Sequence, residues 1–223
     1  MFSRVCFVLC LTLLAACGDG APTPFALDPA APLEAEDRVE PVSSLPEGPY
    51  CKPVNGTYTQ GLKIASQGRR SPQGNFFAEG GGCIQRPISE IWEVLRTAPG
   101  VKWKEARVTQ FKPLPAMAPV AWAFEARYAN GWIARWIMEW RHTPVAGTAD
   151  DPEYVVVKYQ RVSGIVHIEA WEGAIDLKRL DDDWTSVAQL NEIRGSGMSG
   201  IDVTKAVGGL TDLYNNMTSL RTQ

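Results

Sequence analysis

The side chains that could carry out acid–base or metal chemistry are few and far apart in this sequence. The two histidines, His142 and His167, have no second histidine four residues away and no nearby cysteine, which a zinc site would use. No serine lies in a G-x-S-x-G turn, the usual setting of an acyl-transferring nucleophile. Glu169 and Asp176 could form a buried acid–base pair, but their spacing does not single them out. The sequence therefore predicts no catalytic residue, metal ion or cofactor, and it favours a binding protein while leaving an enzymatic activity open.

Two segments that resemble ligand motifs are better explained as turns. Gly195–Gly200 matches the G-x-G-x-x-G pattern of dinucleotide sites, which need a second parallel strand after the helix that follows. Only 23 residues follow Gly200, and a predicted helix takes them up, so the glycines are expected to turn the chain into that helix. Asp181–Asp183 lacks the glycine and the downstream glutamate of a calcium loop, and we expect a hairpin tip there.

The strongest chemical signal is a series of large apolar side chains that alternate with charged ones. Residues 120–128 and 132–140 both show this alternation, and Asn130-Gly131 between them is a typical hairpin turn. Alternation of this kind is typical of strands with one buried and one solvated face. The two segments therefore predict an antiparallel hairpin whose buried face is rich in tryptophan.

Large rigid rings on such a face can either fill a core or line a pocket for an apolar guest. We predict a ligand-binding role for this set as a group. The predicted ligand-binding residues are Trp122, Phe124, Trp132, Trp136, Met138, Trp140 and Tyr159, with Leu210 and Tyr214 from a helix. Tyr128, His142 and Tyr159 could orient the ligand through a polar atom, or each could be a strand residue with a solvated tip.

Further strands are expected on both sides of the hairpin. Extended segments precede it at 57–66 and 75–85. The strands expected after it are 153–161, 164–172, 173–180 and 184–194. The short connections between these segments indicate an antiparallel sheet.

Two helices complete the predicted pattern. Apolar residues at helical spacing over Ile88–Leu95 indicate a surface helix, which Pro87 starts and Pro99-Gly100 ends. A longer helix is predicted from Val203 to Leu220.

The start and interior of the longer helix carry particular signals. Ser199, with Asp202 three residues on, resembles a capping box. Within the helix, Gly209 borders the apolar stripe, where close packing on the sheet could explain it, whereas Gly208 faces outward.

The order of these elements resembles the START-like (SRPBCC) helix-grip superfamily, which includes Bet v 1-like proteins, polyketide cyclases and lipid-transfer domains. The sharpest local match is Arg86-Pro87-Ile88-Ser89-Glu90-Ile91-Trp92-Glu93-Val94-Leu95, and the resemblance covers about residues 75–221. It implies an α+β fold in which a curved antiparallel sheet wraps a long C-terminal helix and leaves an elongated apolar cavity. Residues 50–70 and the Cys51/Cys83 pair are not part of the usual family pattern.

The beginning of the chain indicates export. Arg4 precedes a short apolar run, and small residues then lead to Cys17, as in a secretory signal peptide. The box Leu14-Ala15-Ala16-Cys17 resembles the lipobox of bacterial lipoproteins, in which the cysteine is lipidated. An ordinary signal peptide cut nearby is the alternative. The sequence thus predicts a signal peptide over 1–16, a lipidated, proline-rich tether over 17–49, and a helix-grip domain over 50–223.

The remaining cysteines fit an oxidising compartment. Cys51 and Cys83 are the pair left after the signal peptide and Cys17 are set aside, and a disulfide between them is the favoured interpretation over a reactive thiol or a metal ligand. The predicted location is the cell envelope, with the protein anchored by lipid to the outer or inner membrane and its domain in the periplasm.

Charge and composition narrow the function. The chain has 22 basic and 25 acidic residues, a balance that argues against nucleic acid and against a polybasic membrane-binding patch. We therefore expect a membrane-tethered binding module for a hydrophobic small molecule or lipid. The alternatives are a structural or protein-interaction lipoprotein with a filled core and, less favoured, a cyclase- or hydrolase-like enzyme. The sequence identifies no protein partner.

Overall fold

The structure is a computed structural model that describes residues 50–69, 75–131, 134–164, 168–195 and 200–219. All of them belong to one compact unit of the chain. The predicted signal peptide, Cys17, the tether and Trp132 lie outside the described residues. Within those ranges, no helix has the length and apolar character needed to span a bilayer.

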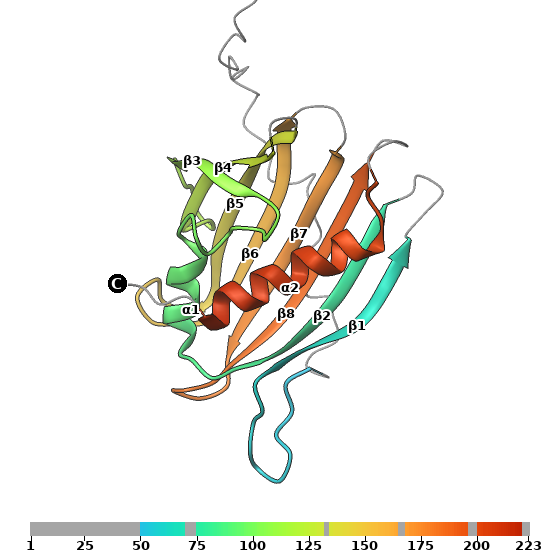
Figure 1. Cartoon of the computed structure of the whole chain (residues 1–223). Helices are drawn as coiled ribbons and strands as arrows, with labels where there is room; N and C mark the ends of the chain where they lie inside the picture. Colours follow the sequence, from blue (N-terminus) through green and yellow to red (C-terminus); the bar gives the residue numbers. More distant parts are fainter. Residues whose placement is uncertain (1–49, 70–74, 132–133, 165–167, 196–199, 220–223) are drawn as a thin grey trace, which may run out of the picture. The chain divides into compact units, whose positions relative to one another are not determined.

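An eight-stranded antiparallel sheet forms most of the described chain (Figure 1). The order across the sheet is β1-β2-β8-β7-β6-β5-β4-β3, so β1 and β3 are its edges. The strands are β1 (Gly61–Arg69), β2 (Phe76–Ile84), β3 (Arg107–Leu114), β4 (Trp122–Asn130), β5 (Ala134–Gly147), β6 (Pro152–Gly164), β7 (Ile168–Arg179) and β8 (Thr185–Gly195). The sheet is curved, and its concave face holds the C-terminal helix, which is the α+β helix-grip arrangement that the sequence predicts.

Two helices pack on the concave side of the sheet. α2 (Val203–Ser219) crosses β2, β8 and β1, while α1 (Ile88–Leu95) lies against β6 and β7 and also contacts α2 (Figure 1). Both predicted helices are confirmed. The start of α2 differs in detail, because Asp202 itself caps the helix: its Oδ1 accepts the backbone N–H groups of Thr204 and Lys205 at 2.9 and 3.3 Å. Ser199 lies outside the described residues.

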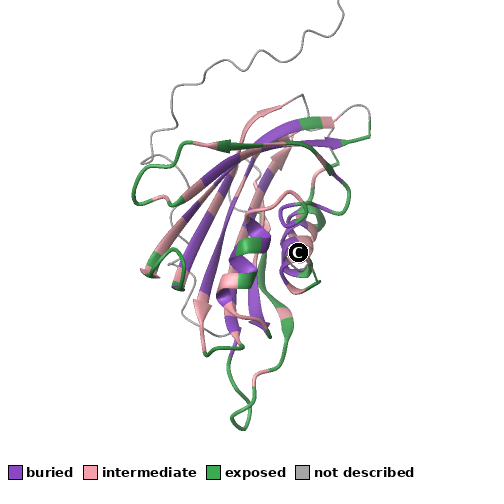
Figure 2. Ribbon diagram, turned by 90° about the vertical axis from the view of Figure 1, so that its left-hand side faces the viewer, coloured by how far each residue is buried: buried purple, intermediate pink, exposed green. Residues whose placement is uncertain are grey.

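The strand register places the predicted aromatic series on the concave face. Phe124 lies opposite Trp140, and Trp140 lies opposite Tyr159, so the three side chains share one face. Tyr128 and Trp136 form a second row of the same kind. Burial follows this face and the facing stripe of α2, as the ribbon coloured by burial shows (Figure 2).

The prediction of separate strands at 164–172 and 173–180 is wrong, because β7 is one continuous strand. Gly173 was expected at a strand boundary, yet it pairs with Tyr159 on one side and Asn191 on the other. A Cβ at Gly173 would come within 2.3 Å of the Tyr159 hydroxyl oxygen, so the glycine makes room for that ring. The sequence pattern predicts no separate strand for β3, because a bulge between Val108 and Gln110 interrupts its alternation.

Tight packing of β1 against β2 explains the glycine run at residues 80–82. A Cβ at Gly82 would lie 1.7 Å from the Gly61 carbonyl oxygen, and one at Gly80 would lie 2.4 Å from that of Lys63. The predicted disulfide is confirmed at the end of this run, where Cys83 is bonded to Cys51 with the Cα atoms 4.9 Å apart.

The hairpin tip predicted at residues 181–183 is also confirmed. It joins β7 to β8, and Asp181 Oδ1 accepts the backbone N–H groups of Asp183 and Trp184 at 2.9 and 2.8 Å. The aspartates therefore serve the turn, as the short side chain of an aspartate often does.

The two adjacent glycines of α2 should respond in opposite ways to alanine. A Cβ at Gly209 would lie 2.5 Å from Asn191 Nδ2, whereas one at Gly208 would meet nothing within 4 Å. Gly208→Ala should therefore raise the free energy of unfolding by about 1 kcal/mol through helix propensity. Gly209→Ala should lower it, because the methyl group forces α2 away from β8. Urea unfolding of both variants measures the difference, and equal effects would contradict this account of the packing.

Candidate functional site

The centre of the interior is occupied by the ring of Trp103, which lies in the segment between α1 and β3 rather than in a strand or helix. Its side chain is buried, and it contacts the rings of four residues from the sheet. The centroid distances are 4.4 Å to Trp171, 4.5 Å to Tyr128, 5.9 Å to Trp140 and 6.2 Å to Tyr159. These distances are typical of attractive aromatic pairs.

The rings around Trp103 also pack on one another. The further pairs are Trp140–Tyr159 at 4.5 Å, Tyr128–Trp136 at 5.5 Å, Trp136–Trp171 at 5.6 Å and Phe124–Trp140 at 6.0 Å. We call Trp103, Phe124, Tyr128, Trp136, Trp140, Tyr159 and Trp171 the aromatic cluster. Every member is less than a tenth exposed, so the cluster forms a continuous apolar interior.

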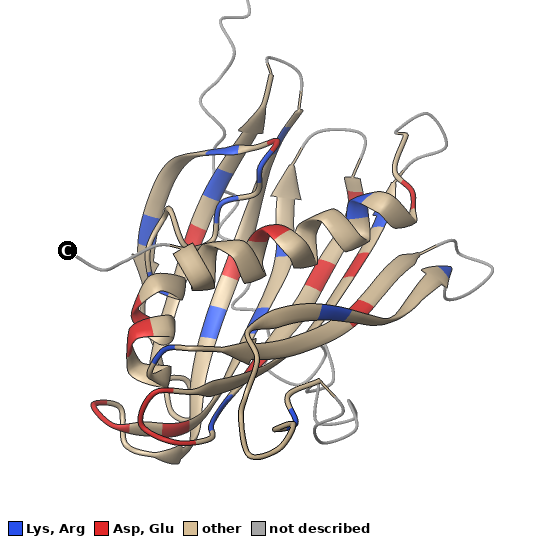
Figure 3. Cartoon of the chain, turned by 60° about the horizontal axis from the view of Figure 1, so that its bottom comes forward, with Lys and Arg blue, Asp and Glu red and all other residues tan. Residues whose placement is uncertain are grey.

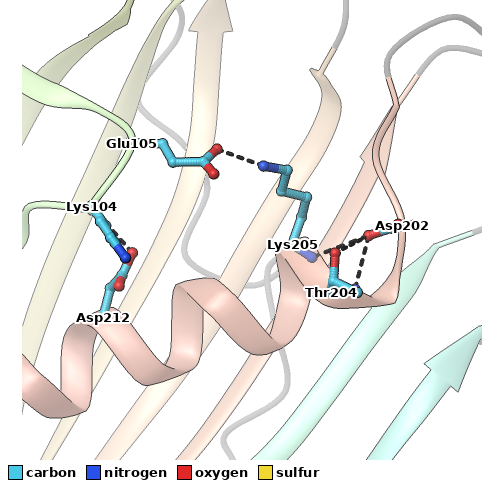
Figure 4. A network of polar contacts seen from close by, with 6 residues as sticks. All are labelled: Lys104, Glu105, Asp202, Thr204, Lys205 and Asp212. Carbon is cyan, nitrogen blue, oxygen red and sulfur yellow. Dashed lines mark hydrogen bonds and ion pairs between the residues drawn. The ribbon is translucent and has the colours of Figure 1, made fainter.

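The segment that carries Trp103 is fastened to α2 by polar contacts on the surface (Figure 4). Both backbone and side-chain groups of the segment take part. The contacts are Lys104 N–H to Asp212 Oδ2 (2.7 Å), Lys205 Nζ to Glu105 Oε2 (2.5 Å), and Asn216 Nδ2 to the carbonyl oxygens of Gly100 (3.0 Å) and Lys102 (2.7 Å). The Lys205–Glu105 ion pair is exposed and contributes little stability by itself, whereas Asp212 and Asn216 are half-buried.

Asn191 is the polar centre of the interior. Its Oδ1 accepts hydrogen bonds from Trp171 Nε1 at 2.8 Å and from the Tyr159 hydroxyl at 3.0 Å. Its Nδ2 donates to the Ala206 carbonyl oxygen in α2 at 2.8 Å. The side chain thus joins β6, β7 and β8 to the helix. Burial raises the pKa of Tyr159 well above its usual value, so this hydroxyl stays protonated.

Gln189, two residues from Asn191 on the same face of β8, has a different environment. Its side chain is 1% exposed, and it lies opposite Ile175, a residue of the core. Neither amide atom has a hydrogen-bond partner among the described residues, and the same is true of the indole N–H groups of Trp103 and Trp136. A buried polar group without a hydrogen-bond partner lowers the stability of the folded state by about 1–3 kcal/mol, so a buried, unpartnered glutamine needs an explanation.

His142 holds α1 against the sheet. The Trp92 indole N–H donates to His142 Nδ1 at 3.0 Å, and the imidazole is fully buried. Burial, with a further contribution from the nearby Arg96, lowers the pKa of His142 to about 3. The ring is therefore neutral at physiological pH, and its Nδ1 is already occupied by a structural hydrogen bond.

The structure brings most of the predicted ligand-binding residues together. Phe124, Trp136, Trp140 and Tyr159 belong to the aromatic cluster, and Met138 and Leu210 are fully buried in the same core. Two predicted residues lie away from the cluster. Tyr214 donates its hydroxyl to the Cys83 carbonyl oxygen at 2.7 Å, and the half-buried Trp122 has the Arg96 guanidinium 5.8 Å from its ring centroid.

Sequence reasoning missed three residues of the site: Trp103, Trp171 and Asn191. Trp171 could have been found, because it alternates with Gly173 and Ile175 along β7 once that strand is treated as continuous. Trp103 carries no periodic signal, since it is a single ring in an irregular segment. Asn191 falls on the buried face of β8 by alternation, but nothing in the sequence distinguishes it as a hydrogen-bonding centre.

The candidate carboxylates do not form an acid–base pair. Glu169 forms an ion pair with Arg194 at 3.0 Å, whereas Asp176 accepts a hydrogen bond from the Tyr154 hydroxyl at 3.1 Å. Asp176 lies between the core residues Ile175 and Leu177 along β7. Because side chains alternate between the two faces of a strand, its carboxylate is on the convex face. In the part of the chain that the structure describes, no three His, Cys, Asp or Glu side chains are grouped as a metal site would need. His167 and residues 196–199 lie outside that part.

Comparison with known proteins finds similarity in chain arrangement alone. No protein-family model matches the chain, and no curated protein matches it. The similar solved structures include two aromatase/cyclases and a lipid transfer domain. The di-domain aromatase/cyclase StfQ of the steffimycin biosynthetic pathway is 15% identical over 63% of this chain, with a TM-score of 0.44. The Zhui aromatase/cyclase from Streptomyces sp. R1128 is 14% identical over 64% of this chain and 93% of its own, with a TM-score of 0.44.

The third structure is the human StarD13 (DLC2) lipid transfer and protein localization domain, which is 9% identical over 73% of this chain and 91% of its own, with a TM-score of 0.45. The chain spans 43% of the length of StfQ. At TM-scores of 0.44 and 0.45, these likenesses assign neither a ligand nor an activity to this chain.

Replacing His142 by glutamine should flatten the pH dependence of stability on the acid side. In the native state the imidazole stays neutral down to about pH 3, whereas in the unfolded chain it takes up a proton near pH 6.5. The free energy of unfolding should therefore fall by up to about 1.4 kcal/mol per pH unit as the pH drops below 6.5. His142→Gln keeps an acceptor for Trp92 but does not titrate. Urea unfolding from pH 7 to pH 4 tests this, and parallel curves for the two proteins would contradict it.

Proposed function

We propose that this protein binds a hydrophobic small molecule or lipid between the concave face of the sheet and α2. The observation that carries the proposal is the buried and unpartnered amide of Gln189, two residues along β8 from Asn191, which bonds to two rings of the aromatic cluster. A ligand with an apolar body and a polar group would pack on the rings and satisfy this amide. Binding would thereby recover the free energy that the unpartnered amide costs in the absence of a ligand.

Trp103 is the ring whose displacement would make room for the ligand. It belongs to neither the sheet nor the helices, and its indole nitrogen has no partner among the described residues. The contacts that fasten its segment to α2 are surface hydrogen bonds and an ion pair, which are weak individually. Movement of this segment would therefore open the interior without breaking the sheet.

A filled structural core is the second candidate, and the continuous ring-to-ring packing of the aromatic cluster favours it. In that case the protein would act through its surface, as a structural or interaction lipoprotein. The two candidates differ in what Gln189 does. In a filled core its amide only costs stability, whereas in a binding site it also holds the ligand.

Replacing Gln189 by leucine separates the two candidates. Because leucine has a similar volume and no polar atoms, Gln189→Leu should raise the free energy of unfolding by about 1–2 kcal/mol. If the interior binds a ligand, the variant should also lose the ligand that the wild type retains. Asn191→Leu is the matched control, and it should lower stability because Asn191 has three hydrogen-bond partners.

Native mass spectrometry after gentle extraction reads out the bound ligand, and uptake of a fluorescent fatty acid or sterol provides a second measurement. Co-purification of a ligand with the wild type and its loss from Gln189→Leu would support the proposal. A wild type with no bound mass and no probe uptake would overturn it and leave the filled core.

Attachment to a membrane is a separate proposal that rests on the sequence of the N-terminal region. The lipobox-like residues 14–17 support lipidation of Cys17, and residues 18–49 have the composition of an extended tether. The order of helix and strands likewise supports membership of the START-like superfamily. On this view the domain samples apolar molecules at a membrane of the cell envelope, with the anchor keeping it near them.

Lipidation predicts that cells grown with radioactive palmitate will label the wild type but not Cys17→Ser. The wild type should fractionate with membranes, and the variant should be released, because acyl chains on one cysteine supply the attachment. Equal labelling of the two proteins, or membrane association that survives the substitution, would contradict the anchor.

A further inference from the structure

A depression on the outside of the molecule lies between the segment before β3 and the turn of the β4–β5 hairpin. Its volume is about 500 Å³, which falls in the range of small-molecule sites. The lining residues are Lys102, Lys104, Glu105, Ala106, Arg107, Ala129 and Gly131. Ala129 follows the interior residue Tyr128 along β4, so its side chain is on the other face of that strand, whereas the lining residue Ala106 belongs to the buried core.

Positive charge predominates among the lining side chains. Lys102, Lys104 and Arg107 are exposed, and none of them forms an ion pair with a carboxylate of the described residues. Glu105, the acidic residue of the lining, is already paired with Lys205. The basic groups of the depression therefore repel one another with little local compensation.

Asp212 is a further carboxylate beside this segment. It accepts the Lys104 backbone N–H at 2.7 Å, and the charge of Lys104 also acts on it. Burial raises the pKa of Asp212 above its usual value, and the carboxyl compensates part of the positive charge of Lys104.

Two more arginines extend the positive charge over the neighbouring strands. Arg107 lies opposite Ala129, which lies opposite Arg135, so both arginines share a face with the floor of the depression. Arg127, two residues before Ala129, is on that face as well. Neither Arg127 nor Arg135 forms an ion pair within the described ranges, although Glu125 lies further along the same face of β4.

This concentration of charge contrasts with the chain as a whole, whose formal net charge is −3. Figure 3 shows basic and acidic residues distributed over the whole ribbon. The overall charge balance predicts no basic patch, because these residues are separated in the sequence and come together only in the fold.

We propose that this depression, the basic pocket, binds a phosphate- or carboxylate-bearing group, either in a free small molecule or in a lipid head group. Ammonium and guanidinium groups form strong, charge-assisted hydrogen bonds with such oxyanions. The concave shape and the limited volume suit one compact anionic group rather than an extended polymer. This inference does not depend on the interior site, because none of the lining residues belongs to the aromatic cluster.

The test compares two triple variants of the protein with the same change in net charge. Lys102→Gln, Lys104→Gln and Arg107→Gln together remove the basic lining of the pocket. Lys52→Gln, Lys63→Gln and Arg69→Gln remove three exposed cations in and just before β1, the edge opposite β3. Isothermal titration with inorganic pyrophosphate should show binding to the wild type and the control variant. Binding to the pocket variant should be weaker by about tenfold or more, and added salt should weaken all binding.

A second arm uses vesicles of phosphatidylglycerol and of phosphatidylcholine. Selective retention on phosphatidylglycerol that the pocket variant loses identifies a lipid head group as the source of the anion, whereas pyrophosphate binding alone identifies a free anion. Both outcomes support the site, and any lipid anchor is common to the two variants.

Lysine acetylation provides a measurement on the unaltered protein. Pyrophosphate or the anionic vesicles should slow the modification of Lys102 and Lys104 several-fold relative to Lys52 and Lys63, as read by peptide mass spectrometry. The inference is overturned if the wild type binds neither probe, if the two triple variants are weakened equally, or if the two pairs of lysines are protected to the same extent.

Discussion

The packing of Trp103 against the rings of the sheet is the interaction on which the interior depends. The sheet supplies walls from β4, β5, β6 and β7, but it has no side chain of its own at the centre of the aromatic cluster. A residue from the segment between α1 and β3 fills that position and contacts four of the rings. The segment that carries Trp103 is also bonded to α2 at several points, so it joins the helix to the rings of the sheet.

Two nearby amide side chains on β8 differ in whether their hydrogen-bonding groups have partners. Asn191 uses both its oxygen, which accepts two hydrogen bonds, and its nitrogen, which joins the sheet to α2 through Ala206. Gln189, on the same face, uses neither atom within the described residues. An interior selected only for stability would carry an apolar residue at the second position, since the exchange removes a desolvation cost. The contrast is the physical basis for assigning a binding role to this space.

The sequence predicts the parts of this molecule that repeat. Alternation identifies β4 and β5 with the turn at residues 130–131, and helical spacing identifies α1 and α2 to within a residue at their starts. Features that occur once are not predictable in this way. The ring of Trp103 has no periodic neighbour. Gly173 suggests a break between strands, yet it lies within β7, where the missing side chain makes room for Tyr159. The basic pocket joins residues of a loop and two strands, so composition alone cannot reveal it.

The sheet has two edge strands, β1 and β3, and both are irregular in ways that hinder pairing with another chain. β1 shifts register between Ile64 and Ser66, and β3 does so between Val108 and Gln110. β3 also contains Pro113, which has no backbone N–H to offer to a neighbour. A strand that is kinked or lacks a donor is a poor template for another chain, so both margins disfavour the continuous ladder that protein aggregates require. A protein held at high local density would gain from such margins, because its copies could crowd together without polymerising.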